Sequence, residues 1–142
     1  MKARKRPRAS KVLVIDDDPG VLEALGLILS QEGFDVALAG SGDEGVTTAR
    51  GAAPADAFDA VITDLKMAGM SGLEALAALR QHDPLLPVIV VSGFLSDEAA
   101  ATCARLGALA TLRKPFDVGD LLAIQQRGLE ARGAALTLIG KP

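Results

Sequence analysis

The chain has 142 residues, 49% of them hydrophobic, and a formal net charge of −3 at neutral pH. This composition is typical of one packed globular domain, and no apolar run approaches the roughly 18 residues that a membrane span requires. One cysteine, Cys103, excludes an internal disulfide framework, and the basic N-terminus lacks the apolar segment of a signal peptide, so we expect a cytoplasmic protein.

Positive charge is concentrated at the N-terminus. No acidic residue precedes Asp16, and the residues from 12 onward carry nine basic and 18 acidic side chains. We therefore expect residues 1–9 to form a disordered basic arm on an acidic body. The alternative is that the arm contacts nucleic acid or an acidic partner, and a steep salt dependence that disappears on its removal would support nucleic-acid binding. The basic residues at this end of the chain are Lys2, Arg4, Lys5, Arg6, Arg8 and Lys11.

The first half of the chain alternates short apolar runs with amphipathic segments. The run over 12–15 is continuously apolar, as in a strand buried on both faces, and Asp18 before Pro19 suits a helix start. Ser41 and Glu44 have the spacing of a capping box at a second helix start. The predicted elements are a strand over 11–15, a helix from 19 to about 33, a strand over 34–38, a helix from 41 to about 51, a loop over 52–56 and a strand over 60–63.

The second half continues the same alternation. Ser71 and Glu74 form another capping box, which opens a helix that ends near Asp83 and Pro84. Gly107 marks the end of the helix that follows the next strand. The predicted elements are a helix from 71 to about 82, a strand over 87–91, a helix from about 96 to 106, a strand over 108–113, a helix from about 118 to 132 and a short tail over 133–142.

A strand followed by a helix therefore occurs five times along the chain. Sequential strands joined by helices form a parallel sheet with right-handed crossovers and with helices on both faces. We predict an α/β fold, a (βα)5 doubly wound five-stranded parallel sheet, over residues 10–132. The tail over 133–142 is too short for a further domain.

Polar side chains stand at the carboxyl ends of four of the predicted strands. Open α/β sheets bind ligands at this edge, and these four strands cluster beyond the point where the strand order reverses, so we expect the side chains to converge. One such aspartate could be an ordinary turn residue, but complementary residues at four strand ends form a specific signal. They are Asp16 and Asp17 after the first strand, Asp64 after the third, Ser92 after the fourth and Lys114 after the fifth.

These residue types fit the chemistry of phosphoryl transfer. Three carboxylates close together require a cation, and oxygen ligands favour Mg²⁺, which takes one or two carboxylates and keeps waters and phosphate oxygens. A carboxylate can attack a phosphoryl group, a lysine can neutralise the transferred group, and a hydroxyl can donate a hydrogen bond to its oxygens. The cluster contains no histidine, cysteine or second base, so acyl transfer and glycoside hydrolysis lack their parts.

Four motifs, in the same order and spacing, resemble those of receiver domains in the two-component response regulator family. The resemblance covers about residues 10–132 and implies a flavodoxin-like sheet with the family's strand order 2-1-3-4-5. The motifs are Val-Leu-Val-Ile-Asp-Asp-Asp at 12–18, Val-Ile-Thr-Asp-Leu-Lys-Met-Ala-Gly-Met-Ser-Gly at 61–72, Val-Val-Ser-Gly at 90–93 and Leu-Arg-Lys-Pro-Phe at 112–116.

The resemblance implies a role for each residue at the strand ends. Asp64 matches the phosphoacceptor, Ser92 the switch hydroxyl and Lys114 the lysine that contacts phosphate. The peptide bond between Lys114 and Pro115 is usually cis in the family, in keeping with the low cis penalty of proline. The Mg²⁺ site would consist of Asp17 as a direct ligand, Asp16 acting mostly through water, Asp64 and the backbone carbonyl of Lys66.

Three features depart from the family pattern. Ala68 replaces a common proline, which predicts a less rigid loop at that point. Thr111 replaces the usual Tyr or Phe that rotates on activation, so switching would pass through Ser92 and the loop after it. Lys66 and Phe94 occupy positions from which family members can orient an attacking water. Because neither is a carboxylate or an amide, we expect slow self-dephosphorylation.

The resemblance implies a signalling receiver that accepts phosphate from a phosphohistidine on a sensor histidine kinase or a histidine phosphotransfer protein. Such a protein catalyses its own phosphorylation and dephosphorylation without being a conventional turnover enzyme. Phosphorylation would switch the binding of a downstream protein partner or relay phosphate onward. Homodimers through the face of the fourth helix, fifth strand and fifth helix are common in the family, although not universal.

Two alternatives remain. The chain could be a receiver module excised from a hybrid histidine kinase or a transcriptional regulator, although Met1 and the short tail favour a complete small protein. It could also be a receiver-like interaction module that takes no phosphate. The complete set of charged residues argues against this second alternative, because a decayed site has no physical need for convergent charges.

Overall fold

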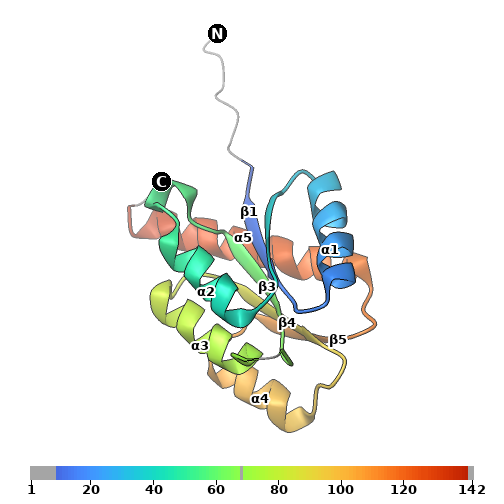
Figure 1. The fold of residues 1–142 in the computed structure, drawn as a ribbon. Coiled ribbons are helices and arrows are strands. Elements are labelled where there is room, and N and C mark those ends of the chain that lie inside the picture. Colours follow the sequence, from blue (N-terminus) through green and yellow to red (C-terminus); the bar gives the residue numbers. More distant parts are fainter. Residues whose placement is uncertain (1–8, 68, 141–142) are drawn as a thin grey trace.

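The computed structural model describes residues 9–67 and 69–140. Five parallel strands form one sheet in the order β2-β1-β3-β4-β5, which confirms the predicted fold class and strand order (Figure 1). Residues 1–8 of the predicted basic arm, and the predicted loop effect of Ala68, lie outside the described residues. The strands are β1 (Lys11–Ile15), β2 (Asp35–Ala39), β3 (Ala60–Asp64), β4 (Val88–Ser92) and β5 (Ala110–Arg113).

Helices cover both faces of the sheet, as the strand and helix alternation predicted. Buried residues of α2, α3 and α4 pack against one face, and those of α1 and α5 pack against the other. The predicted loop over 52–56 contains one short 3-10 turn, η1 (Pro54–Asp56). The helices are α1 (Pro19–Gln31), α2 (Gly42–Gly51), α3 (Gly72–His82), α4 (Asp97–Arg105) and α5 (Val118–Leu138).

The core is aliphatic and lies on both sides of the strands. On β1, Leu13 and Ile15 join the cluster beneath α2 and α3, while Val12 and Val14 join the cluster beneath α1 and α5. Successive strand residues point to opposite faces, so a strand covered on both faces must be apolar at every position. This is why the central strands read as continuous apolar runs and why polar groups are confined to the strand ends.

Side-chain caps set the helix starts where the sequence predicted them. The carboxylate of Asp18 accepts hydrogen bonds from the backbone N–H groups of Gly20 and Val21 at the start of α1. Ser71 and Glu74 form the reciprocal capping box at the start of α3. Such caps satisfy backbone donors that have no partner within the helix, at about 1 kcal/mol each.

The fifth helix is longer than predicted. It continues to Leu138, although the sequence indicated an end near Arg132. Arg132 is buried, with Nη2 at 3.0 Å from Asp83 Oδ2 and Nε at 3.8 Å from Asp59 Oδ1. These ion pairs hold the last turns of α5 against the loops at the amino edge of the sheet. No helix in the described part of the chain is both long and apolar enough to span a membrane.

Gln125 is a second buried polar residue of α5, besides Arg132. Its side chain is 0% exposed, and neither amide atom has a hydrogen-bond partner among the described residues. A buried amide without partners loses its hydration and gains nothing in return. The neighbouring Gln126 is exposed, and its Nε2 donates to Glu130 Oε1 at 3.2 Å.

We expect Gln125→Met to raise the free energy of unfolding by about 1–3 kcal/mol, because methionine keeps the shape without the unpaired amide. The measurement is the urea midpoint at constant m value. Gln126→Met is the matched control and should change stability by less than about 0.5 kcal/mol. An unchanged midpoint for Gln125→Met would show that the amide is satisfied in solution.

Candidate functional site

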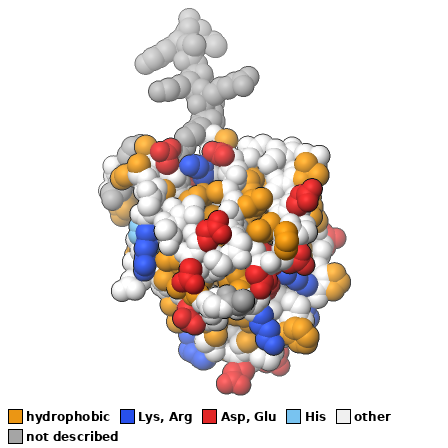
Figure 2. All heavy atoms as spheres, in the orientation of Figure 1, with side chains coloured by type: hydrophobic (Ala, Val, Ile, Leu, Met, Phe, Trp, Pro, Cys, Tyr) orange, Lys and Arg blue, Asp and Glu red, His pale blue; other side chains and the backbone are white. Residues whose placement is uncertain are grey.

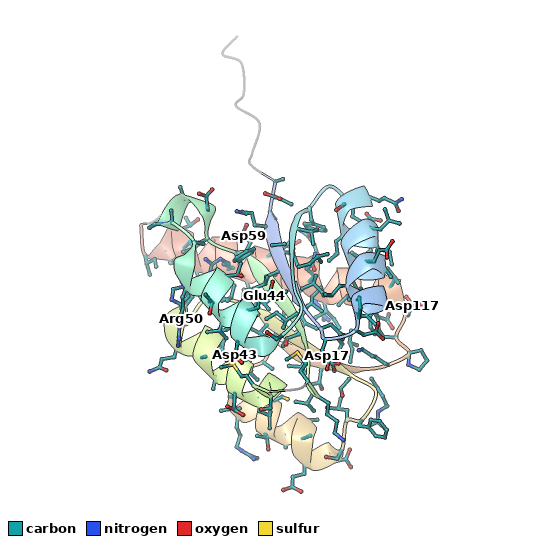
Figure 3. All side chains as sticks on the ribbon, viewed as in Figure 1. Asp17, Asp43, Glu44, Arg50, Asp59 and Asp117 are labelled. Carbon is teal, nitrogen blue, oxygen red and sulfur yellow. The ribbon has the colours of Figure 1, made fainter. Side chains whose placement is uncertain are left out.

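Three carboxylates converge at the carboxyl edge of the sheet, as predicted. Asp16 and Asp17 directly follow β1, and Asp64 is the last residue of β3. One oxygen from each of the three carboxylates lies within 4.8 Å of the chosen oxygens of the other two. Asp16 and Asp64 are buried, whereas Asp17 is exposed at the mouth of the cluster (Figure 3). The cluster therefore combines two desolvated charges with one that faces solvent.

Lys114 supplies the positive charge of this site. Its Nζ lies 2.9 Å from Asp16 Oδ2 and 3.4 Å from Asp64 Oδ2, so one ammonium bridges two carboxylates. The backbone positions it at the end of β5, where its N–H donates to the carbonyl of Ser92 at 2.8 Å. The peptide bond between Lys114 and Pro115 is cis, as the family resemblance implied.

The carboxylate of Asp64 is held at both oxygens. Oδ1 accepts the backbone N–H of Leu65 at 2.7 Å, and Oδ2 faces Lys114. Burial raises the pKa of Asp64 above 3.8, and the charge of Asp16 raises it further, while Lys114 and the Leu65 N–H oppose this rise. The carboxylate is therefore more basic than an exposed aspartate.

The pKa of Lys114 is also raised. Burial acts to lower it, but the hydrogen bond to Asp16 and the charges of Asp64 and Asp16 together outweigh this effect. The ammonium form is thus favoured by the pair of carboxylates around it. Their attraction holds the lysine beside both carboxylates.

The first residue of α3, Gly72, lies against the backbone of Asp64 and Leu65 and keeps Asp64 in position. The N–H of Gly72 donates to the carbonyl of Leu65 at 2.8 Å. A methyl group at position 72 would overlap the carbonyl oxygen of Asp64 and the Cα of Leu65. The sequence did not indicate this role of Gly72, because a close approach between segments leaves no local signal.

Ser92 lies at the same edge, but its hydroxyl has a local partner. Its Oγ donates to the carbonyl of Phe94 and accepts the N–H of Phe94, both at 3.2 Å. The side chain is 1% exposed and stands at the end of β4. Prediction from sequence placed Ser92 correctly at this edge and did not identify this bond to the following loop.

Two contacts near the site have no clear signal in the sequence. The ammonium of Lys66 lies over the ring of Phe94, 4.8 Å from its centroid. Arg113 Nη2 donates to the carbonyl of Leu95 at 2.7 Å. All four residues line one cavity of about 630 Å³, formed by Leu65, Lys66, Ser71, Leu73, Gly93, Phe94, Leu95, Ser96, Ala99 and Arg113.

The donor set fits a hard divalent cation. Carboxylate oxygens are the ligands that Mg²⁺ and Ca²⁺ prefer, and the exposed Asp17 leaves the cluster accessible from solvent. A second cavity of about 400 Å³ opens beside it and is lined by Asp17, Leu65, Lys66, Met67 and Ser71. A cation and an anionic group could therefore meet at this mouth.

The family model described as the response regulator receiver domain matches residues 12–126. The transcriptional regulatory protein GlrR of Escherichia coli is 35% identical over 130 residues, which cover 90% of this chain and 28% of GlrR. The regulator NtrC of Salmonella typhimurium is 29% identical, covering 92% of this chain and 29% of NtrC. The chain thus spans less than a third of the length of these curated relatives.

Solved structures of receivers have the same fold. A response regulator receiver domain protein from Clostridium thermocellum superposes with a TM-score of 0.83 at 29% identity, covering 89% of this chain and 98% of that one. A response regulator from Burkholderia pseudomallei, with a phosphorylated aspartic acid, a calcium ion and citrate, gives a TM-score of 0.76 at 28% identity. That match covers 92% of this chain and 75% of the other.

The raised pKa of Asp64 predicts how stability depends on pH. The folded protein binds the Asp64 proton more tightly than the unfolded chain does. The contribution of Asp64 to the free energy of unfolding therefore decreases as the pH rises from 3.8 through the raised pKa. In metal-free buffer we expect Asp64→Asn to be more stable than the wild type at neutral pH, with the difference shrinking in acid. The measurement is urea unfolding across pH.

Asp35→Asn, at an exposed position at the opposite edge of the sheet, is the control for the loss of one negative charge. Its difference from the wild type should vary less with pH than that of Asp64→Asn. A wild type that gains stability relative to Asp64→Asn as pH rises would contradict the prediction.

Proposed function

The chain belongs to the response regulator receiver family, and from this premise we propose that it accepts a phosphoryl group on Asp64. The donor would be a phosphohistidine of a sensor histidine kinase or a histidine phosphotransfer protein. The observation that carries the proposal is the ammonium of Lys114, which lies within 3.4 Å of the carboxylates of both Asp16 and Asp64. A lysine in this place meets the phosphoryl oxygens as they arrive on Asp64.

In the proposed reaction an Asp64 carboxylate oxygen attacks phosphorus. A new O–P bond forms while the N–P bond to the donor histidine breaks, and the histidine nitrogen keeps the electron pair. The N–H of Leu65 holds Oδ1 and so orients the carboxylate. Burial raises the pKa of the Asp64 carboxylate and so makes it a better nucleophile, while Lys114 beside it opposes this rise and favours the ionised form.

The residues that would hold Mg²⁺ are Asp17, Asp64, the backbone carbonyl of Lys66 and, mostly through water, Asp16. Bound there, Mg²⁺ supplies positive charge that neutralises the transferred oxygens. Asp17 suits direct ligation because it is exposed at the mouth of the cluster. Asp16 is already engaged, since its Oδ1 accepts the N–H of Asp18 at 2.9 Å and its Oδ2 pairs with Lys114.

Ser92 would report the phosphoryl group to the surface. A hydroxyl carries one proton, which Ser92 donates to the carbonyl of Phe94 in this structure. A phosphoryl oxygen on Asp64 is a stronger, charged acceptor, so the hydroxyl would leave Phe94 and the loop between β4 and α4 would rearrange. We place the downstream partner, or a second copy of the chain, on the adjacent face of α4, β5 and α5.

A second candidate concerns the role of the whole protein. The chain matches under a third of transcriptional regulators such as GlrR, so it could be the receiver of a longer regulator rather than act alone. The chemistry at Asp64 would be the same in either case. In this proposal the protein acts in the cytoplasm, because the phosphohistidine donors of such systems are located there.

The acidic surface does not favour nucleic acid as a partner of the body. The residues from 12 onward carry nine basic and 18 acidic side chains, and acidic groups are spread over the face that carries α1 and α2 (Figure 2). Phosphate backbones require clustered positive charge. The proposed partners are therefore proteins.

We expect the wild type to gain one phosphoryl mass on incubation with acetyl phosphate and Mg²⁺, and Asp64→Ala to gain none, because the proposed reaction uses the Asp64 carboxylate as the nucleophile. The measurement is intact mass spectrometry. Asp59→Ala is the matched control, since Asp59 immediately precedes the same strand at the opposite edge of the sheet (Figure 3). Equal gain by Asp64→Ala, or none by the wild type, would overturn the proposal.

The phosphoryl group should be lost slowly, over minutes or longer, because neither Lys66 nor Phe94 can orient or deprotonate an attacking water. The measurement is the decay of the phosphorylated mass after removal of the donor. Lys66→Glu introduces a carboxylate at this position and should hasten the decay. A wild-type half-life of seconds would contradict the prediction.

A further inference from the structure

Three side chains from outside the loop hold the short segment between β4 and α4. The hydroxyl of Ser92 makes two hydrogen bonds to the backbone of Phe94. The ammonium of Lys66 lies over the Phe94 ring. Arg113 Nη2 donates to the carbonyl of Leu95 at 2.7 Å, which is the shortest of the three contacts. The segment is thus fixed by groups that belong to, or adjoin, the carboxylate site.

Arg113 connects this loop to the groups that would meet the phosphoryl group. It lies opposite Ser92 in the register of β4 and β5. It immediately precedes Lys114, whose N–H is bonded to the carbonyl of Ser92 at 2.8 Å. The paired ends of β4 and β5 therefore carry the hydroxyl, the ammonium and the guanidinium, and Arg113 adjoins both Ser92 and Lys114.

Arg113 also occupies the face of β5 from which the usual aromatic is missing. Residues two apart on a strand point to the same face, so the side chains of Thr111 and Arg113 share one face of β5. Thr111 lies opposite Val90, one repeat further from the carboxyl edge than Arg113. The guanidinium is long enough to reach the loop, as its bond to Leu95 demonstrates.

We propose that Arg113 is the positioning residue that couples the state of the Asp64 site to the loop between β4 and α4, in the place of an aromatic at position 111. This inference rests on the proposed function. When the Ser92 hydroxyl donates its hydrogen bond to a phosphoryl oxygen instead, its bonds to Phe94 are lost. The loop then remains attached through the contacts of Lys66 and Arg113. The bond to Leu95 then determines where the loop moves, and with it the start of α4.

The test measures backbone amide exchange by NMR on the full chain, before and after phosphorylation with acetyl phosphate and Mg²⁺. The amide of Phe94 reports Ser92 directly, because its N–H donates to the Ser92 hydroxyl. In the unphosphorylated protein, Arg113→Ala should speed exchange over residues 94–97 about fivefold, as the loss of one hydrogen bond implies. The change in these exchange rates on phosphorylation, which we call the loop response, should fall in Arg113→Ala to about half of the wild-type value or less.

The variants distinguish the coupling between the Asp64 site and the loop from the phosphorylation of Asp64 itself. Arg113→Ala should gain the same phosphoryl mass as the wild type, and Arg113→Lys, which keeps a charged donor, should retain most of the loop response. Arg105→Ala is the matched control, because the guanidinium of Arg105 bonds only to Thr102 on its own helix among the contacts found. Its loop response should equal that of the wild type.

Two failures can be told apart. A wild type that gains no phosphoryl mass overturns the proposed function and this inference with it. A wild type that is phosphorylated, with a loop response that Arg113→Ala leaves unchanged, overturns the inference alone. An equal loss of response in Arg105→Ala also overturns it, because the effect would then not depend on the bond to Leu95.

Discussion

The ammonium of Lys114, placed between two buried carboxylates, is the interaction on which the site depends. Asp16 and Asp64 are each at least nine-tenths buried, and two such charges at one strand edge repel each other in a poorly solvated region. Lys114 offsets this repulsion, as the opposing effects on the pKa of Asp64 indicate. Lys114 stands at the end of β5, and it reaches both carboxylates because β5, β4, β3 and β1 lie side by side in the sheet.

The aliphatic core makes this arrangement of charges specific. With both faces of the sheet covered by helices, a polar side chain within a central strand would be buried without a partner, so polar groups occur where the strands end. At the carboxyl edge, residues from several strands can therefore meet each other and solvent. Gly72 contributes by letting α3 begin against the backbone of Asp64.

The alternation of strands and helices and the polar residues at the strand ends could be predicted because they depend on local patterns, whereas the strand order came from the family resemblance. Apolar runs, capping boxes and strand-end motifs are each contained within about ten residues. The end of α5 could not be predicted in this way, because the helix contacts segments that are distant in the sequence, as the ion pairs of Arg132 with Asp59 and Asp83 show. Gln125 followed the helical pattern without indicating that its amide would be buried unpaired.

The sequence by itself determined the α/β class, the family and the residue types at the carboxyl edge. Only the tertiary structure decided how these residues are engaged: one lysine shared by two carboxylates, a serine bonded to its own loop, and Lys66 and Arg113 holding that loop from two other segments. Local patterns record which face a residue occupies and where an element ends. They do not record which atoms meet across segments, because those distances depend on the packing of the whole sheet.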